Sequence, residues 1–238
     1  MTGRKVWKGF NDLQSCYPEL AKQWNYAKNV GLLPEEVTSS SGLKVWWILP
    51  YDDPNTGKHF DFEWKATVAS RTGSKAGCPY LTGGAVWPGY NDLQTLFPEL
   101  ARQWHLNKND GLTPDKVIAS STRKAWWILP YDEQETGEHF EFEWEASIAS
   151  RTDLGAGCPY LAGKAVWPKY NDLETKEPRL AKELDEKRNR GKTAYNIYYR
   201  SSKKVWWKCP ECGSSWRASV YHRAVDGSGC PECIKRMR

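Results

Sequence analysis

The chain has 238 residues, of which 34 are basic and 29 acidic, giving a formal net charge of +5 at pH 7. No apolar run approaches the ~20 residues of a membrane span, and the N-terminus lacks the apolar stretch of a signal peptide, so we expect no membrane partner. Seven cysteines in a chain without a secretion signal favour a reducing, cytoplasmic setting.

The sequence repeats itself with a period of 80 residues. Asn-Asp-Leu at 11–13 recurs at 91–93 and 171–173, and a pair of tryptophans shows the same spacing. A fixed period of this length is the signature of a repeat architecture. We therefore expect three tandem modules, at residues 3–82, 83–162 and 163–238, the third shorter by eight residues. Modules of this size have thin cores and usually need a staple such as a metal.

Each module is predicted to hold a short helix followed by a β-hairpin. In the first module Pro18 and Glu19 suit the first turn of a helix over residues 17–24. Strands are expected at 44–49 and 60–68, the second because apolar and polar residues alternate along it with period two. With a Cys-Pro turn closing the hairpin, we expect each module to be a small α+β unit.

Near the C-terminus four cysteines form two Cys-x-x-Cys pairs, with 17 residues between the pairs. This spacing is typical of a zinc site, because each pair presents two sulfurs to one tetrahedral ion. We expect one zinc ion per chain, bound by Cys209, Cys212, Cys230 and Cys233. Two disulfides or four free thiols are the alternatives. A shell of four cysteines leaves no position for a catalytic water, so the predicted site is structural.

The first two modules lack most of these ligands. In the first module Leu49, Asp52, Cys78 and Leu81 align with the four cysteines, and the second module has the same residue types. We predict that both modules are zinc-free, that the leucines fill the site, and that the eight-residue insertion compensates by lengthening the hairpin. The alternative is an altered metal site of mixed ligands. It would consist of Asp52, His59 and Cys78, and of Asp132, His139 and Cys158.

Charge is distributed unevenly along the chain. Residues 84–163 carry 6 basic and 12 acidic side chains, whereas residues 164–238 carry 18 and 9. The basic third module is therefore the expected contact for nucleic acid, with DNA favoured over RNA. Cations match phosphates, and aromatic faces stack on exposed bases. The predicted contacts are Arg188, Arg190, Lys192, Arg200, Lys203, Lys204, Tyr198 and Tyr199.

One arginine recurs at the same position of each module, as Arg71, Arg151 and Arg223. It stands three residues beyond an apolar strand position. We expect Arg223 to add a contact to the nucleic-acid backbone. The alternative is that this arginine pairs with an acidic residue inside its own module.

These motifs together resemble a known family. Asn-Asp-Leu, Pro-x-Leu-Ala, Lys-Asn, Ser-x-x-Lys-x-Trp-Trp and the Cys-Pro-x-Cys pairs, in this order, are similar to the "probable zinc-ribbon" family of treble-clef-like modules. Such modules often occur in tandem and are sometimes joined to very-short-patch-repair-like endonucleases. The resemblance covers nearly the whole chain and implies nucleic-acid binding in a bacterial, phage or mobile-element context. The first two copies have lost the metal ligands and are degenerate.

Two other classes of function compete with nucleic-acid binding. A protein-binding adaptor or inhibitor would use the acidic second module, whose hairpin carries six glutamates, to dock a basic partner. An enzyme would need a constellation such as His59 with Asp61 or Glu63. Because acidic residues are ordinary on a wet strand face, and because no nucleophile–base pair or phosphate loop stands out, we predict a non-enzymatic protein.

Overall fold

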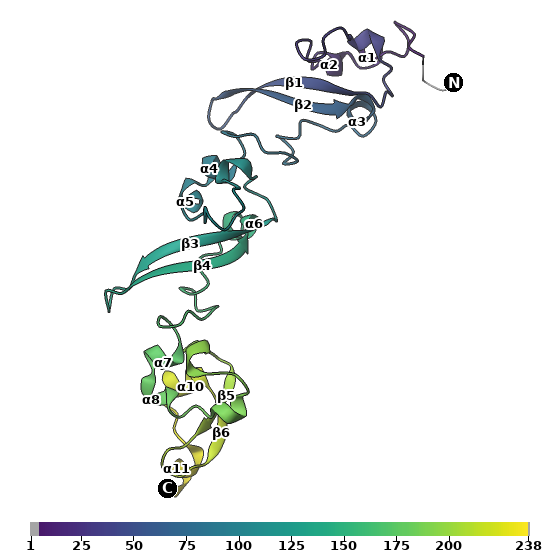
Figure 1. Cartoon of the computed structure of the whole chain (residues 1–238). Helices are drawn as coiled ribbons and strands as arrows, with labels where there is room; N and C mark the ends of the chain where they lie inside the picture. Colours follow the sequence, from purple (N-terminus) through teal and green to yellow (C-terminus); the bar gives the residue numbers. More distant parts are fainter. Residues whose placement is uncertain (1–4, 238) are drawn as a thin grey trace. The chain divides into compact units, whose positions relative to one another are not determined.

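Short helices and two-stranded antiparallel hairpins alternate along the chain in the computed structural model, which describes residues 5–237 (Figure 1). The chain divides into two compact units. The first contains the residues up to Pro98 together with 113–120, and the second contains 99–112 together with the residues from Ser121 onward. No helix in the described residues is long and apolar enough to cross a membrane.

The first two modules have matching elements. The first module contains α1 (Leu13–Cys16), α2 (Pro18–Ala21), the 3-10 helix η1 (Pro34–Glu36), β1 (Lys44–Asp52), β2 (His59–Thr67) and α3 (Val68–Thr72). The second contains α4 (Leu93–Leu96), α5 (Pro98–Ala101), η2 (Pro114–Lys116), β3 (Lys124–Asp132), β4 (His139–Ser147) and α6 (Ile148–Thr152).

The third module differs from them mainly at its C-terminal end. It contains α7 (Leu173–Lys176), α8 (Pro178–Ala181), α9 (Glu186–Asn189), η3 (Ala194–Asn196), β5 (Lys204–Lys208), β6 (Ser215–Ser219), α10 (Val220–Ala224) and α11 (Pro231–Arg236). Strands β5 and β6 have five residues each, against nine in β1 and β2, because the third module lacks the eight-residue insertion. Helix α11 begins within the second cysteine pair, with Cys230 as its N-cap and Cys233 in its first turn, and neither α11 nor α9 has a counterpart in the other modules.

The Asn-Asp-Leu motif starts each module because its aspartate caps a helix. The buried Asp12 carboxylate accepts hydrogen bonds from the backbone N–H groups of Ser15 at 2.8 Å and Gly9 at 2.6 Å. Burial opposes ionisation of this carboxyl, but these hydrogen bonds outweigh it and lower the pKa of Asp12. The predicted helix at 17–24 is present in a shorter form as α2, with Pro18 at its first position.

Both predicted strands of the first hairpin are also present, with different ends: β1 continues to Asp52 beyond the predicted 49, and β2 spans His59–Thr67 rather than 60–68. In the hairpin Trp47 lies opposite Trp64, and the insertion extends the pairing to Leu49 opposite Phe62 and Tyr51 opposite Phe60. Strand β2 ends at Thr67 rather than at 68, because the Thr67 hydroxyl accepts the N–H of Ser70 and caps α3.

Tryptophans and one arginine form the centre of each core. Trp24 meets the fully buried Trp47 edge to face, with ring centroids 5.8 Å apart. The guanidinium of Arg71 lies 4.9 Å from the Trp47 ring and 5.0 Å from the Trp64 ring, and it donates a hydrogen bond to Gln23. Trp127 and Trp207 are also fully buried, so the recurring strand tryptophans at these positions serve as core residues.

Candidate zinc centre and nucleic-acid interface

The four cysteines of the third module converge from two short segments. Cys209 and Cys212 lie in the turn between β5 and β6, and Cys230 and Cys233 lie at the start of α11. The Sγ atoms of Cys209 and Cys233 are 3.7 Å apart, and those of Cys212 and Cys230 are 3.6 Å apart. All four sulfurs lie within 4.8 Å of one another. A tetrahedral zinc ion with Zn–S bonds of about 2.3 Å requires S···S distances of about 3.8 Å, so the geometry fits one zinc ion.

The electrostatics of the cluster also match a cation. Hydrogen bonds from Ser214 lower the pKa of the Cys212 thiol to about 6, so this sulfur is readily available as a thiolate. Contacts with the Cys212 and Cys209 sulfurs raise the pKa of Cys233. Several thiolates so close together repel one another, and a bound divalent cation removes that repulsion. The cluster therefore has the chemistry of a closed structural zinc site, with all four positions held by protein sulfur.

In the first module, aromatic rings occupy the place that corresponds to the zinc site. Leu49 opposite Phe62 takes the position of Cys209 opposite Ser214. Phe62 is fully buried, and Cys78, the counterpart of Cys230, is buried beside it in the same core cluster. The expectation that leucines fill the site is wrong for Leu81, which is 40% exposed. Phenylalanine and tyrosine rings fill it instead.

The altered metal site of mixed ligands does not form either. The His59 ring nitrogen Nδ1 lies 2.6 Å from the Asp52 carboxylate at the exposed end of the hairpin. Asp52 raises the pKa of His59 through this hydrogen bond. Cys78 is buried in the core instead. Among residues 5–237, the four-cysteine cluster is the only group of three or more metal-ligating side chains placed to share an ion.

The rings that fill this place in the first module form an aromatic cluster, and residues that follow the module complete it. Trp87 meets Phe62 and Tyr80 edge to face, with ring centroids 5.2 and 4.8 Å away. Tyr90 packs on Phe62, with centroids 5.0 Å apart. The second hairpin has the same arrangement. There Trp167 and Tyr170 pack on Phe142, at 5.4 and 4.9 Å, and Trp167 also packs on Tyr160.

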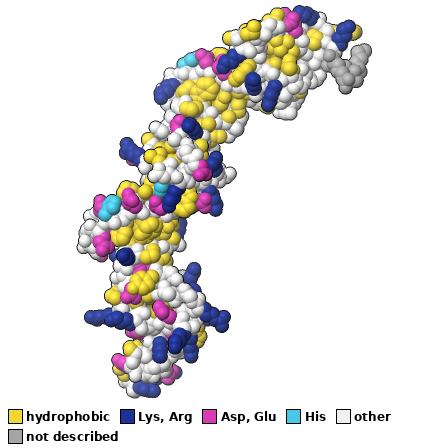
Figure 2. All heavy atoms as spheres, in the orientation of Figure 1, with side chains coloured by type: hydrophobic (Ala, Val, Ile, Leu, Met, Phe, Trp, Pro, Cys, Tyr) yellow, Lys and Arg dark blue, Asp and Glu magenta, His cyan; other side chains and the backbone are white. Residues whose placement is uncertain are grey.

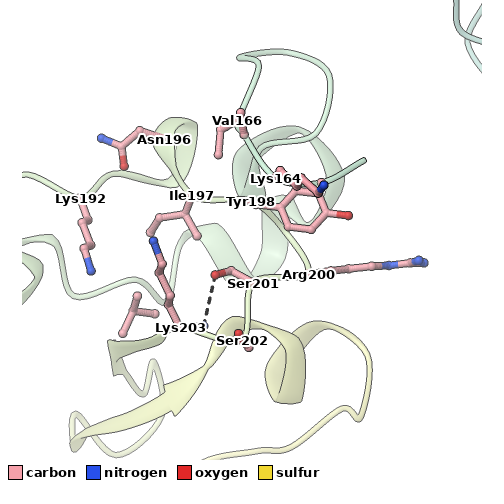
Figure 3. Close-up of a pocket in the computed structure, with 13 residues that line it drawn as sticks. Lys164, Val166, Lys192, Asn196, Ile197, Tyr198, Arg200, Ser201, Ser202 and Lys203 are labelled. Carbon is pink, nitrogen blue, oxygen red and sulfur yellow. Dashed lines mark hydrogen bonds between the residues drawn. The ribbon is translucent and has the colours of Figure 1, made fainter. Parts of the chain in front are cut away.

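A basic pocket opens in the third module, between residues 163–166 and the segment from Lys192 to Val205. Its volume is about 400 Å³, and four cations line it: Lys164, Lys192, Arg200 and Lys203. Figure 3 shows the Tyr198 ring beside Lys164, while the Lys192 and Lys203 side chains lie on the other side of the pocket. At Gly163, a Cβ atom would lie 2.6 Å from the Tyr198 ring, so only glycine allows the chain to pass so close.

Two of these cations, Lys192 and Arg200, are particular to the third module, whereas Lys203 corresponds to Arg123 in the second module and Lys164 to Arg4 in the first. The positions of Lys192 and Arg200 are Leu112 and Ser120 in the second module, and they are Leu32 and Ser40 in the first. The position of Lys164 is Gly84 in the second module. Sequence reasoning missed Lys164, although its replacement of a glycine was a visible signal. Figure 2 shows Lys and Arg side chains on the C-terminal part of the second unit.

The other predicted contacts differ in where they lie. Arg188 is exposed and stacks over the Trp206 ring at 4.9 Å, and Arg200 lies 5.0 Å from the Tyr199 ring. Arg190 and Lys204 are exposed as well, Arg190 at the end of α9 and Lys204 at the start of β5. Arg188, Arg190 and Lys204 do not line the basic pocket.

Arg223 requires a correction. It is only 7% exposed, it forms an ion pair with Glu183, and its guanidinium lies 5.3 Å from the Trp207 ring. A side chain enclosed in this way is not available to phosphates, so Arg223 does not belong to the predicted nucleic-acid contacts. In the third module this arginine therefore pairs with an acidic residue of its own module, as the alternative prediction stated. In the first two modules the partner is Gln23 or Gln103.

Comparison with known proteins agrees with the repeat architecture and with the cysteine cluster. Residues 20–80, 100–164 and 180–236 each match a family described as a probable treble clef zinc finger domain. The three matches cover more than half of the chain and fall one in each module. No curated protein matches the chain.

Proposed function

Because the chain belongs to the family of probable treble clef zinc finger domains, we propose that it is a non-enzymatic nucleic-acid-binding protein, with its third module as the main contact. DNA is the favoured ligand. In this proposal zinc holds the binding module folded and takes no part in chemistry. Structural zinc contributes an apparent ~10–16 kcal/mol to small fingers, which is enough to stabilise a module with a thin core. The joining of such modules to very-short-patch-repair-like endonucleases stays a prediction.

The basic pocket is the observation that supports this proposal. Four cations around one cavity create a positive potential that attracts phosphate groups. Tyr198, half-buried at the edge of the pocket, offers a ring on which an unpaired base can stack. Arg188 and Lys204 extend the positive surface beyond the pocket. A polyanion with flat, stackable groups satisfies both features, whereas a simple anion uses only the first.

The test uses substitutions that the fold already accepts in the sister modules. Lys192→Leu with Arg200→Ser places the residues of the first two modules in the pocket of the third. Binding of short labelled DNA and RNA is measured for the full chain at two salt concentrations. We expect weaker binding, with a salt slope that is smaller by about 1.4–1.8 if both cations contact phosphates.

The matched control removes two exposed lysines from the first module. Lys44→Ser with Lys58→Leu gives the same loss of charge at a distance in sequence from the pocket. We expect binding by this variant to stay close to that of the unmodified chain. Equal losses in the two variants would indicate attraction by net charge alone, and the pocket would lose its role.

A second candidate function is docking of a basic protein on the second module. Glu143 and Glu145 are ion-paired with Lys108 and Lys124, but Glu135, Glu138 and Glu141 are exposed near the tip of the β3–β4 hairpin. This acidic tip repels nucleic acid and suits a cationic peptide. Binding of a lysine-rich peptide, abolished by replacing these three glutamates with glutamine, would support the adaptor. Binding that persists in the triple variant would count against it.

A further inference from the structure

The contact between a hairpin and the segment after it follows one pattern in the first two modules. The hairpin presents Tyr51, Phe60 and Phe62, and Tyr90 packs on all three, with ring centroids 5.8, 5.2 and 5.0 Å away. The Asn91 side chain adds a polar contact, because its Nδ2 donates to the Tyr80 carbonyl at 2.9 Å. At the second hairpin Asn171 donates to the Tyr160 carbonyl in the same way, at 2.8 Å.

The same segment occurs a third time, at residues 5–11, where Trp7 and Phe10 take the positions of Trp87 and Tyr90. Its backbone already has the docked conformation. The Trp7 N–H donates to the Asn11 side chain at 2.7 Å, as the Trp87 N–H does to Asn91. Gly9 has φ +81°, against +84° at the corresponding glycine. Yet Trp7 is 58% exposed and Phe10 is 73% exposed.

We propose that residues 5–11 are a docking segment, which inserts Trp7 and Phe10 into the aromatic hairpin of another zinc-free treble clef module carried by a second polypeptide. The two internal copies of the segment show the chemistry of the partner. It must offer two phenylalanines and two tyrosines in the places of Phe60, Phe62, Tyr51 and Tyr80. It must also offer a free backbone carbonyl to Asn11, whose Nδ2 donates within the described residues to the Lys5 carbonyl.

The three hairpins of this chain do not provide that partner in the native state. The first hairpin is occupied by Trp87 and Tyr90, and the second by Trp167 and Tyr170. The third lacks the insertion that supplies the phenylalanines and has the cysteine cluster instead. The proposed occupant is a module with an open hairpin on another polypeptide. A segment that already has its bound conformation loses little conformational entropy on docking, and tryptophan is among the commonest anchors of protein interfaces.

An open hairpin can be made in this chain by removing the rings that fill it. The receptor variant carries Trp87→Ala and Tyr90→Ala, which vacate the first hairpin, and Trp7→Ala and Phe10→Ala, which remove its own docking segment. It is mixed with the unmodified chain and followed by sedimentation velocity and light scattering. We expect a 1:1 complex with twice the 27.3 kDa mass of one chain.

The control is the partner chain without its docking rings. Unmodified chain carrying only Trp7→Ala and Phe10→Ala should form no complex with the receptor variant. If the receptor variant loses its native circular dichroism, a second receptor that keeps Trp87 and carries Tyr90→Ala replaces it. A receptor that keeps native circular dichroism and one zinc but stays monomeric beside the unmodified chain overturns the proposal. Quenching of Trp7 fluorescence by oligothymidine, without such a complex, would also overturn it and would make the segment a base-stacking surface.

Discussion

Phe62 meets Trp87 edge to face, with ring centroids 5.2 Å apart and ring planes at 79°. Phe62 stands opposite Leu49 in the hairpin of the first module, and Trp87 belongs to the segment that opens the second. At the matching place in the third module Cys209 stands opposite Ser214, and the four thiols gather there. The same position in the fold is therefore filled in two ways. In the first module an aromatic cluster that includes rings of the next module fills it, and in the third module a zinc site fills it.

If the aromatic cluster takes the place of zinc, removing its central ring should be costly. We expect Phe62→Ala to destabilise the first unit by about 3–5 kcal/mol, because the side chain is fully buried. The measurement is hydrogen exchange of the β1 and β2 amides, together with urea unfolding. Phe10→Ala is the control, since this ring is 73% exposed, and it should change stability by less than about 0.5 kcal/mol. Similar effects of the two substitutions would contradict the structural role given to Phe62.

The zinc site gives a prediction with an internal control. We expect one zinc ion per chain by metal analysis, and Cys230→Ser should abolish it and unfold the third module. Cys78→Ser changes the matching cysteine of the first module, which lies in the aromatic cluster, and it should leave the zinc content unchanged. Zinc that survives in Cys230→Ser, or two or more zinc ions in the unmodified chain, would contradict the assignment.

The repeats, the hairpins and the zinc ligands could be predicted from the sequence because each leaves a local signal. The 80-residue period indicates the three modules, the alternation of apolar and polar residues predicts β2, and the spacing of the two Cys-x-x-Cys pairs predicts the zinc ligands. What fills the vacated site could not be predicted in this way. Trp87 and Tyr90 lie beyond the boundary at residue 82, and an alignment of separate modules treats them as the start of the next one. The burial of the Arg223 side chain could not be predicted either. Sequence spacing places a residue on a helix or strand, but it does not show whether its side chain faces the core or the solvent.

Tyr90 makes the aromatic cluster sensitive to alkaline pH. Burial, followed by the neighbouring Tyr51 hydroxyl, raises the pKa of Tyr90 from 10.0 to about 12. The folded state therefore holds this proton more tightly than the unfolded state does. Its stabilising contribution is complete below about pH 10 and is lost as the pH rises to about 12.

We therefore expect the urea midpoint of the first unit to fall between about pH 10 and pH 12. Tyr90→Phe should reduce this fall, and it introduces the residue that Phe10 supplies at the same position of the first module. Tyr26→Phe is the control, because Tyr26 is 57% exposed, and its pH profile should match that of the unmodified chain. Identical profiles for all three proteins would show that Tyr90 does not couple to folding.

The positive surface of the third module gives the last prediction, through two pairs of basic residues at matching positions. Lys203 lines the basic pocket, and Lys204 is exposed at the start of β5. In the second module Arg123 and Lys124 take these positions, but Lys124 is ion-paired with Glu145, 3.4 Å away. The third module has Arg217 where the second has Glu145. The two matching pairs of cations therefore have different surroundings, which are positive in the third module and negative in the second.

Reversing Lys203 and Lys204 to glutamate should weaken nucleic-acid binding and flatten its dependence on salt, by roughly 0.7–0.9 in slope for each phosphate that is no longer neutralised. Arg123→Glu with Lys124→Glu changes the charge by the same amount, but we expect a much smaller effect, because residues 84–163 already carry twice as many acidic as basic side chains. Titration of a labelled oligonucleotide at several salt concentrations distinguishes the two variants. Equal losses would mean that the modules bind as one continuous array. No loss from either pair, with binding of a lysine-rich peptide to the acidic tip, would favour the adaptor.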